Sequence, residues 1–317
     1  MDLWKLRLSM VGTLALVISL STLVFTLLLS YAGVFDYLTL GVMVVVVNIA
    51  QWLIAPYIVD AIYRVHPMSE SENPQLHQAV ANLSQKSGIS KPKLMLAQIP
   101  LPNAFAYGSP LTGNKVAVTQ GLLKNLNEEE VEAVLGHELG HLKHRDVQVM
   151  MAISILPALF TYLGYMFMFQ GQGNRRNEGG NGAIIGIAFI AFSWVLNLFT
   201  LYLSRLREYY ADRHSASVTN DGARNLSSGL AKIVYATQRS RFPQEKKKNL
   251  TAFKALFISD PDKANADSAA LAAIEVTKEN LVQQIISREP TFADRVIEVL
   301  STHPNIVKRL RALQELN

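Results

Sequence analysis

The sequence predicts a mainly helical membrane protein with four membrane-spanning helices and a small β-sheet in its soluble part. The 317 residues are 50% hydrophobic and only 17% charged, a balance that is unusual for a soluble domain. Four stretches carry no Asp, Glu, Lys, Arg or His over a length that fits the hydrocarbon core of a bilayer. Short β-like segments with turn signals lie between the second and the third of these stretches.

The four predicted spans divide the chain into two membrane hairpins and two soluble segments. Residues 1–62 and 147–203 are the predicted hairpins, and residues 63–146 and 204–317 are the predicted soluble segments. The alternative for spans three and four is a pair of buried core helices, but their charge-free length fits a bilayer better. The spans are Leu8 to Tyr31, Tyr37 to Val59, Val147 to Phe169 and Ala183 to Leu203.

The first span shares one feature with a signal peptide, because Lys5 and Arg7 precede it. Its apolar stretch is longer than a usual signal core and no A-x-A cleavage site follows, so we expect an anchor. Most basic residues near the span ends fall on one side of the membrane, and the positive-inside rule predicts that this side is cytoplasmic. Both chain termini, residues 137–141 and Glu208 would then face the cytoplasm. That side holds Lys5, Arg7, Arg64, Lys143, Arg145, Arg205, Arg207 and Arg213, and the other holds Arg175 and Arg176.

Charge and cysteine content narrow the expected partners and the compartment. The net charge of +5 is modest, and beside membrane spans it favours contact with lipid headgroups over nucleic acid. Lys246, Lys247 and Lys248 form either a solvated loop or such a headgroup contact. The absence of cysteine fits a reducing compartment.

The first soluble segment is predicted to form a helix followed by three strands. A helix is expected over Pro74 to Ser87, and strands over Lys93 to Ala97, Ala104 to Tyr107 and Lys115 to Thr119. Gly113-Asn114 predicts the turn between the last two strands.

A metal-binding motif follows these strands, at His137-Glu138-Leu139-Gly140-His141. Asn127 before three glutamates predicts a helix start, and on a helix the two histidines share one face. Zinc bound there makes water a nucleophile near neutral pH, and Glu138, turned about 100° round the helix, is predicted to be the general base and acid. We expect this helix to run on into the third span.

A catalytic zinc needs a third protein ligand. His144 is unsuitable, because seven residues of helix rise about 10.5 Å, and it is expected at the surface. Glu208 is the better candidate, with Asp212 one turn later placed to accept the outer N–H of a ligand histidine. The alternative is that both carboxylates pair with Arg205, Arg207 or Arg213 at a wet helix surface.

HELGH, followed two spans later by SRLREYYAD, resembles the HtpX-type membrane metalloproteases, relatives of the CAAX prenyl proteases. The resemblance covers nearly the whole chain and includes Asn103-Ala104-Phe105-Ala106 and Ser301-Thr302-His303-Pro304. It implies a zincin-like fold with one Zn²⁺ on His137, His141 and Glu208, and Glu138 as the catalytic residue.

The same resemblance implies further residues that contact the substrate. Asn103, Ala104, Phe105 and Ala106 would bind the peptide as an added strand, although the residues alone fit equally well a structural strand with Phe105 in the core. His303 and Arg309 would bind the substrate or the transition state. Asn305 departs from the family pattern, where a second proline is frequent, which leaves the local turn open.

The expected function is a zinc endopeptidase of the cytoplasmic membrane that cleaves cytosolic segments of membrane or misfolded proteins, with no nucleic-acid partner. The quality-control role comes from the resemblance. Cobalt or manganese could also occupy such a site. Three alternatives are a CAAX-type prenyl endopeptidase, which needs more spans than four, a noncatalytic membrane adaptor or transporter, and a soluble zinc protease with a twin-helix anchor.

Overall fold

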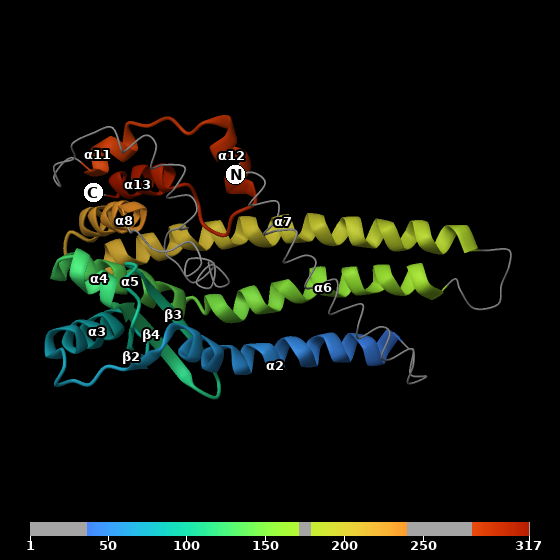
Figure 1. Cartoon of the computed structure of the whole chain (residues 1–317), viewed down its shortest axis with the longest axis horizontal. Coiled ribbons are helices and arrows are strands. Elements are labelled where there is room, and N and C mark those ends of the chain that lie inside the picture. Colours follow the sequence, from blue (N-terminus) through green and yellow to red (C-terminus); the bar gives the residue numbers. More distant parts are fainter. Residues whose placement is uncertain (1–36, 171–178, 240–280, 317) are drawn as a thin grey trace. The chain divides into compact units, whose positions relative to one another are not determined.

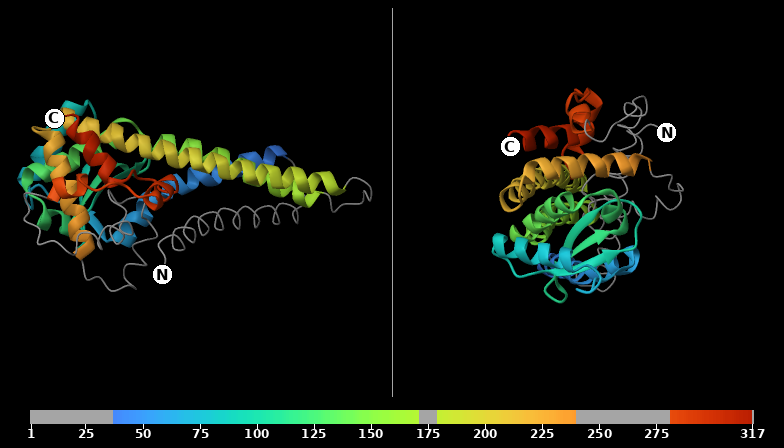
Figure 2. Two further views of the ribbon diagram at one scale, coloured as in Figure 1. Left: turned by 90° about the horizontal axis from the view of Figure 1, so that it is seen from above. Right: turned by 90° about the vertical axis from the view of Figure 1, so that its left-hand side faces the viewer.

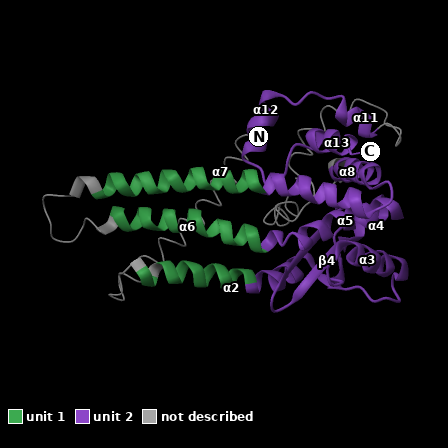
Figure 3. Ribbon diagram, turned by 180° about the vertical axis from the view of Figure 1, so that it is seen from behind, with its two compact units in different colours: residues 1–52, 148–203 green, residues 53–147, 204–317 purple. Residues whose placement is uncertain are grey.

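A computed structural model describes residues 37–170, 179–239 and 281–316 of the chain. The first predicted span, Leu8 to Tyr31, lies outside these residues, as do Arg175, Arg176 and the lysines at 246–248. The chain divides into two compact units, which are coloured separately in Figure 3. Unit 1 holds residues 1–52 and 148–203, and unit 2 holds residues 53–147 and 204–317.

Three long apolar helices supply the described part of unit 1. They are α2 (Tyr37–Tyr63), α6 (Asp146–Gln170) and α7 (Gly179–Val218), and each continues into unit 2 at one end. All three are long and apolar enough to cross a membrane, over Gly41–Tyr63, Asp146–Met168 and Gly182–Val218. The described helices therefore match three of the four predicted spans.

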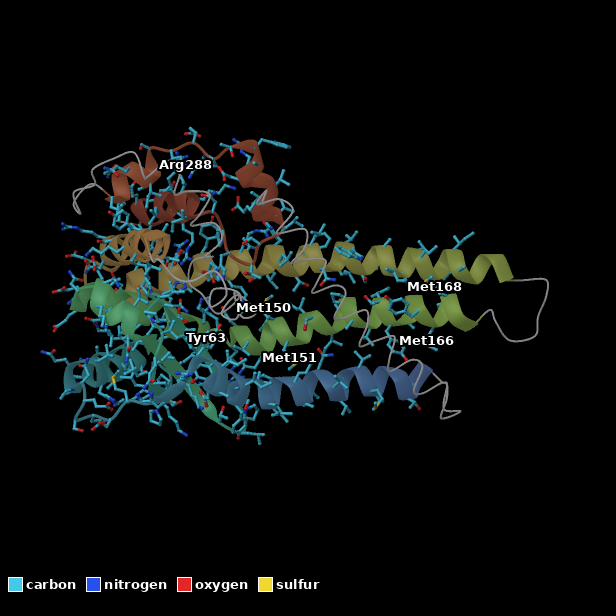
Figure 4. All side chains as sticks on the ribbon, in the orientation of Figure 1. Tyr63, Met150, Met151, Met166, Met168 and Arg288 are labelled. Carbon is cyan, nitrogen blue, oxygen red and sulfur yellow. The ribbon has the colours of Figure 1, made fainter. Side chains whose placement is uncertain are left out.

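Within unit 1, α6 and α7 pack through small residues and aromatic rings. Thr161 donates a hydrogen bond to Ser193 at 2.9 Å, and a Cβ added at Gly164 would lie 2.8 Å from the Gly186 carbonyl oxygen. Met166 is fully buried on α6, whereas Met168, half a turn on, is 37% exposed (Figure 4). Most of these helix surfaces are exposed and apolar, which disfavours the alternative of buried core helices.

Unit 2 contains a four-stranded sheet with the order β1-β2-β4-β3. The strands β2 and β4 run parallel, and the two outer pairs are antiparallel. The strand bounds are β1 (Val65–Pro67), β2 (Lys93–Ala97), β3 (Ala104–Ser109) and β4 (Gly113–Thr119). All three predicted strands are present, and β3 lies at an edge of the sheet.

The turn predicted at Gly113-Asn114 was wrong. Ser109 pairs with Gly113 in the β3–β4 ladder, so the loop consists of residues 110–112 and both Gly113 and Asn114 belong to β4. Gly113 has a φ of 71°, and this left-handed conformation, which glycine adopts without strain, ends a three-residue loop rather than a two-residue turn.

Helices pack around the sheet and around α5 (Glu128–Lys143), which carries the metal-binding motif. The predicted helix α3 (Pro74–Ser87) is confirmed, with Asn73 capping its start and Gly88 its end. The sheet and α3 lie on one side of α5, and α8 lies on the other (Figures 1 and 2). The remaining helices are α4 (Gln120–Asn125), α8 (Gly222–Arg239), α11 (Leu281–Ile286), α12 (Phe292–Val299) and α13 (Ile306–Gln314).

The prediction that the metal-binding helix runs on into the third span was also wrong. Helix α5 begins after Asn127, as its sequence predicts, where Asn127 and Glu130 form a capping box, and it ends at Lys143. Arg145 then takes a φ of 53°, a left-handed conformation that interrupts the helix, and α6 starts at Asp146. This break sets Asp146 on a new helix axis.

Candidate metal centre

The two histidines of the HELGH motif project from one face of α5 and meet side by side. Their Nε2 atoms lie 3.1 Å apart, and the His137 side chain is 1% exposed. Gly140, between them, allows α7 to approach closely, since an added Cβ would lie 3.1 Å from the Cα of Ala211. Ser215 of α7 also donates a hydrogen bond of 2.6 Å to the Ala133 carbonyl on α5. Small residues thus bring the two helices into contact at the motif.

This close packing brings Glu208 of α7 to the two imidazoles. Its carboxylate oxygens lie 3.7 Å from His137 Nε2 and 3.6 Å from His141 Nε2. The ligand atoms of His137, His141 and Glu208 all lie within 4.8 Å of one another, so the group could hold a metal ion. A tetrahedral ion with bonds of about 2.0–2.2 Å holds its ligand atoms roughly 3.3–3.6 Å apart. The donor set and its spacing therefore fit zinc.

Each imidazole has a carboxylate at its other nitrogen. Asp212 Oδ1 lies 2.9 Å from His137 Nδ1, and Asp146 Oδ2 lies 2.6 Å from His141 Nδ1. A carboxylate in this position fixes the tautomer that leaves Nε2 free for a metal and raises the basicity of the ring. The two carboxylates therefore prepare both histidines for the same role.

Asp146 is a functional candidate that the sequence analysis missed. On a continuous helix, five residues after His141, it would lie about 140° away round the axis. The left-handed Arg145 returns it to the His141 ring. The available signal was a carboxylate closely following the motif, but no glycine or proline marked the break.

Arg309 of α13 joins the two carboxylates of α7. Its guanidinium donates to Asp212 at 2.9 and 2.6 Å and lies 2.9 Å from Glu208 Oε2. The residue is 1% exposed. Burial alone would lower the pKa of Arg309, but Asp212 and Glu208 raise it above its ordinary value, so the guanidinium stays charged. One buried positive charge thus faces two carboxylates, and a divalent cation would supply the remaining positive charge.

His303 lies at the same cluster, with Nδ1 3.3 Å from Glu208 Oε1. The structure therefore brings His303 and Arg309 to the metal-binding group, although they follow Glu208 by 95 and 101 residues in the sequence. The alternative in which nearby arginines hold Glu208 and Asp212 at a wet surface was wrong. Both acids are buried, Arg205 donates to backbone carbonyls of residues 298, 299 and 301, and Arg207 pairs with Asp146.

Glu138 points from α5 toward the edge strand β3. The residue is 4% exposed, and its Oε2 accepts a hydrogen bond of 2.8 Å from the backbone N–H of Ala106. Burial raises the pKa of Glu138, although His141, His137 and the Ala106 N–H oppose this shift. A carboxylate with a raised pKa accepts a proton more readily and is suited to general base and acid chemistry.

The Asn103 to Ala106 stretch forms the first half of β3. Asn103 bonds to Thr119 through its backbone, so by the alternation of antiparallel pairs Ala104 and Ala106 direct their N–H and C=O groups away from β4. Phe105 is buried against Tyr63, with ring centroids 5.5 Å apart. This burial agrees with the alternative of a structural strand that has Phe105 in the core. The peptide groups on the outer side of β3 are the part of this stretch that faces Glu138.

His144 does not join the metal-binding group. It ends α5 as its C-cap and lies exposed at the surface, with its ring 6.1 Å from that of His214. This agrees with its exclusion as a ligand.

Comparison with known proteins identifies the class and then the family. The profile of peptidase family M48 matches residues 70–317. A protease HtpX homolog of Thermoplasma acidophilum is 37% identical over 278 residues, covering 86% of this chain and 83% of the relative. One of Picrophilus torridus is 34% identical over 321 residues, covering 99% and 98%. The crystal structure of S. mikatae Ste24p superimposes with a TM-score of 0.56 at 17% identity, over 98% of this chain and 66% of that longer chain.

Three apolar helices, an HExxH helix and a His-His-Glu group together define a membrane metalloprotease. The chain belongs to peptidase family M48. Its likeness to Ste24p concerns the fold.

Proposed function

We propose that this metalloprotease is a zinc-dependent endopeptidase of the cytoplasmic membrane that cleaves cytosolic segments of membrane proteins or misfolded proteins. His137, His141 and Glu208 would hold the zinc ion, and Glu138 would be the catalytic residue. The observation that carries this proposal is the spacing of 3.1, 3.6 and 3.7 Å among the three ligand side chains. Zinc at such a site supplies Lewis acidity and makes water a nucleophile near neutral pH.

The residues of this chain divide the remaining work. Glu138 takes a proton from the attacking water and returns it to the departing amine, and the hydrogen bond from Ala106 holds its carboxylate in place. Asp212 and Asp146 orient the two histidines. Arg309 holds Glu208 and Asp212 in position, and His303 is close enough to the cluster to contact the reacting peptide.

The edge strand β3 would bind the substrate as an additional strand. The outward N–H of Ala104 and the outward carbonyls of Ala104 and Ala106 can bond to an extended polypeptide whatever its side chains, which suits a protease acting on unfolded segments. The Ala106 N–H is bonded to Glu138 instead. The hydrogen bond from Ala106 to Glu138 supports this proposal, because the carboxylate assigned to catalysis lies beside that strand. Substrate backbone bound there would lie next to the metal-binding group.

The test replaces Glu138 by Gln in the detergent-purified full-length chain. Because Gln cannot accept the proton, we expect Glu138→Gln to keep a full equivalent of zinc and to cleave casein about 10²–10⁴-fold more slowly. Glu129→Gln, the same change on an exposed residue of α5, is the control and should cleave normally. Glu208→Ala should lose zinc by metal analysis. Casein cleavage by Glu138→Gln at the wild-type rate would refute the mechanism.

The same protein can be tested against a prenylated CAAX peptide. We expect no cleavage, because the described chain has three candidate spans and the proposal assigns it unfolded segments as substrates. Cleavage of the prenylated peptide in preference to casein would favour the prenyl endopeptidase instead. The cytoplasmic orientation is tested by a cysteine at Glu129, which an impermeant reagent should label only in inside-out vesicles.

A further inference from the structure

The last turns of α2 belong to unit 2 and have two different faces. One face carries Val59 and Tyr63, which are buried against the sheet beside Phe105. The other face is apolar and exposed, and no described residue covers it. This exposed face, here called the α2 face, consists of Ile54, Tyr57, Ile58 and Ile62.

The tip of the β3–β4 hairpin lies against the same part of α2. Ser109, the last residue of β3, donates a hydrogen bond of 3.3 Å to the Leu53 carbonyl. Leu111, in the three-residue loop that follows, is 64% exposed. Leu53 lies inside the stretch of α2 that is long and apolar enough to cross a membrane, Gly41–Tyr63. The hairpin tip is therefore beside a candidate membrane span.

The one charged residue among Leu53 to Tyr63 is Asp60, and both of its oxygens are bound. Tyr107 donates to one oxygen and Lys115 to the other, each at 2.5 Å. Both partners are largely buried. A carboxylate on a helix in lipid is costly unless it is paired and faces protein, and Asp60 meets both conditions. At a wet surface such shielding would be unnecessary.

We propose that the α2 face and Leu111 lie in the lipid bilayer, so that unit 2 is partly immersed in the membrane. The bilayer surface would then lie close to Arg64, which is the next charged residue after Asp60 and is exposed. The α2 face lies within the candidate span Gly41–Tyr63, and large exposed apolar side chains on a span are expected in lipid and are costly in water. The continuity of α2 from the span into unit 2 favours lipid over a protein partner as the occupant.

The immersion has a consequence for substrates, which rests on the proposed function. From Ser109 at the hairpin tip to Ala106 beside Glu138 is three residues of strand, about 10 Å. A polypeptide bound along β3 would therefore be cut close to the bilayer surface. The substrate class that fits is an unfolded segment within a few residues of a membrane span.

The immersion can be measured by spin labelling, since the chain has no cysteine and single-cysteine variants need no background changes. Nitroxides at Leu111 and Ile58 in nanodiscs should be relaxed more by oxygen, which concentrates in lipid, than by a water-soluble nickel chelate. Ile49, on α2 within the candidate span, is the lipid control, and Glu129 is the water control. Stronger relaxation by the nickel chelate would place these residues in water and overturn the proposal. Protection from both reagents would indicate a protein partner and would also overturn it.

A second measurement tests the consequence with the Leu111→Glu variant. This variant should cleave soluble casein at the wild-type rate but cleave a bilayer-anchored substrate with its unfolded segment next to the span at least fivefold more slowly. Leu111→Met, which keeps an apolar tip, should cleave both substrates normally. Equal cleavage of the anchored substrate by Leu111→Glu and wild type would refute the consequence. If the wild type cleaves neither substrate, the proposed function fails while the spin-label result still decides the immersion.

Discussion

The two histidines of the metal-binding group have the same kind of support in different surroundings. His137 contacts Asp212, which Arg309 holds, and the three side chains are 1%, 3% and 1% exposed. His141 contacts Asp146, which Arg207 holds, and these are 20%, 12% and 12% exposed. Asp146 belongs to α6, the helix that follows α5 in the chain, whereas Arg309 belongs to α13, the last described helix. The buried arrangement and the partly exposed one thus repeat a single order of imidazole, carboxylate and guanidinium.

Because the contacts are of the same type, the difference in burial should decide how much each group contributes to the free energy of unfolding and to zinc affinity. Charges in a buried network interact strongly and are costly to leave unpaired, whereas partly exposed ion pairs are screened by water. Mutations on the His137 side should therefore have larger effects than the matching mutations on the His141 side.

The largest effect is expected for Arg309→Met, which leaves Glu208 and Asp212 buried without their guanidinium. In metal-free protein it should lower the free energy of unfolding by about 3–5 kcal/mol, measured by urea denaturation in detergent. The control is Arg311→Met, two residues along α13, where the arginine is 38% exposed and should cost about 1 kcal/mol or less. Equal losses in both variants would show that the buried network does not depend on Arg309.

The next effect in size is expected for Asp212→Asn. Removing this charge takes away the group that orients His137. Zinc affinity, measured by competition with a chromogenic chelator, should therefore fall by an amount near the upper end of the range of about 10–100-fold. Asp221→Asn makes the same change at an exposed turn and should bind zinc normally. Unchanged affinity in Asp212→Asn would mean that His137 is oriented by packing alone.

Asp146→Asn tests the partly exposed side with the same assay. Because water can replace part of the lost interaction at His141, zinc affinity should fall by only about tenfold. The comparison between the two sides would be wrong if this loss equalled or exceeded that of Asp212→Asn.

The smallest effect is expected for Arg207→Gln. Its ion pair with Asp146 is worth roughly 0.5–1 kcal/mol at this exposure, which corresponds to a loss of zinc affinity of about two- to fivefold. In the Asp146→Asn background the same change should cost nothing further, because its partner carboxylate is already gone. Additive losses in the double mutant would place the contribution of Arg207 elsewhere, for example at the His144 carbonyl that it also contacts.

Local patterns predicted much of the fold. The helix start at Asn127, the helix from Pro74 to Ser87 and the three apolar helices follow from residue patterns within one element at a time. The break at Arg145 did not follow, because a left-handed non-glycine residue leaves no mark in a helix-favouring sequence. The β3–β4 loop was misplaced because Gly113 fits a two-residue turn as well as the end of a longer loop.

For the candidate site, the sequence by itself determined the chemical types: two imidazoles and a glutamate at helical spacing, and a carboxylate pair on a later helix. That much is local, since residues four apart on a helix share a face. Only the tertiary structure decided that Glu208 meets both histidines, that Asp146 supports His141, and that Arg309 holds the carboxylates from α13. Contacts between distant segments depend on how helices pack and where they break, and the packing of the whole unit sets both.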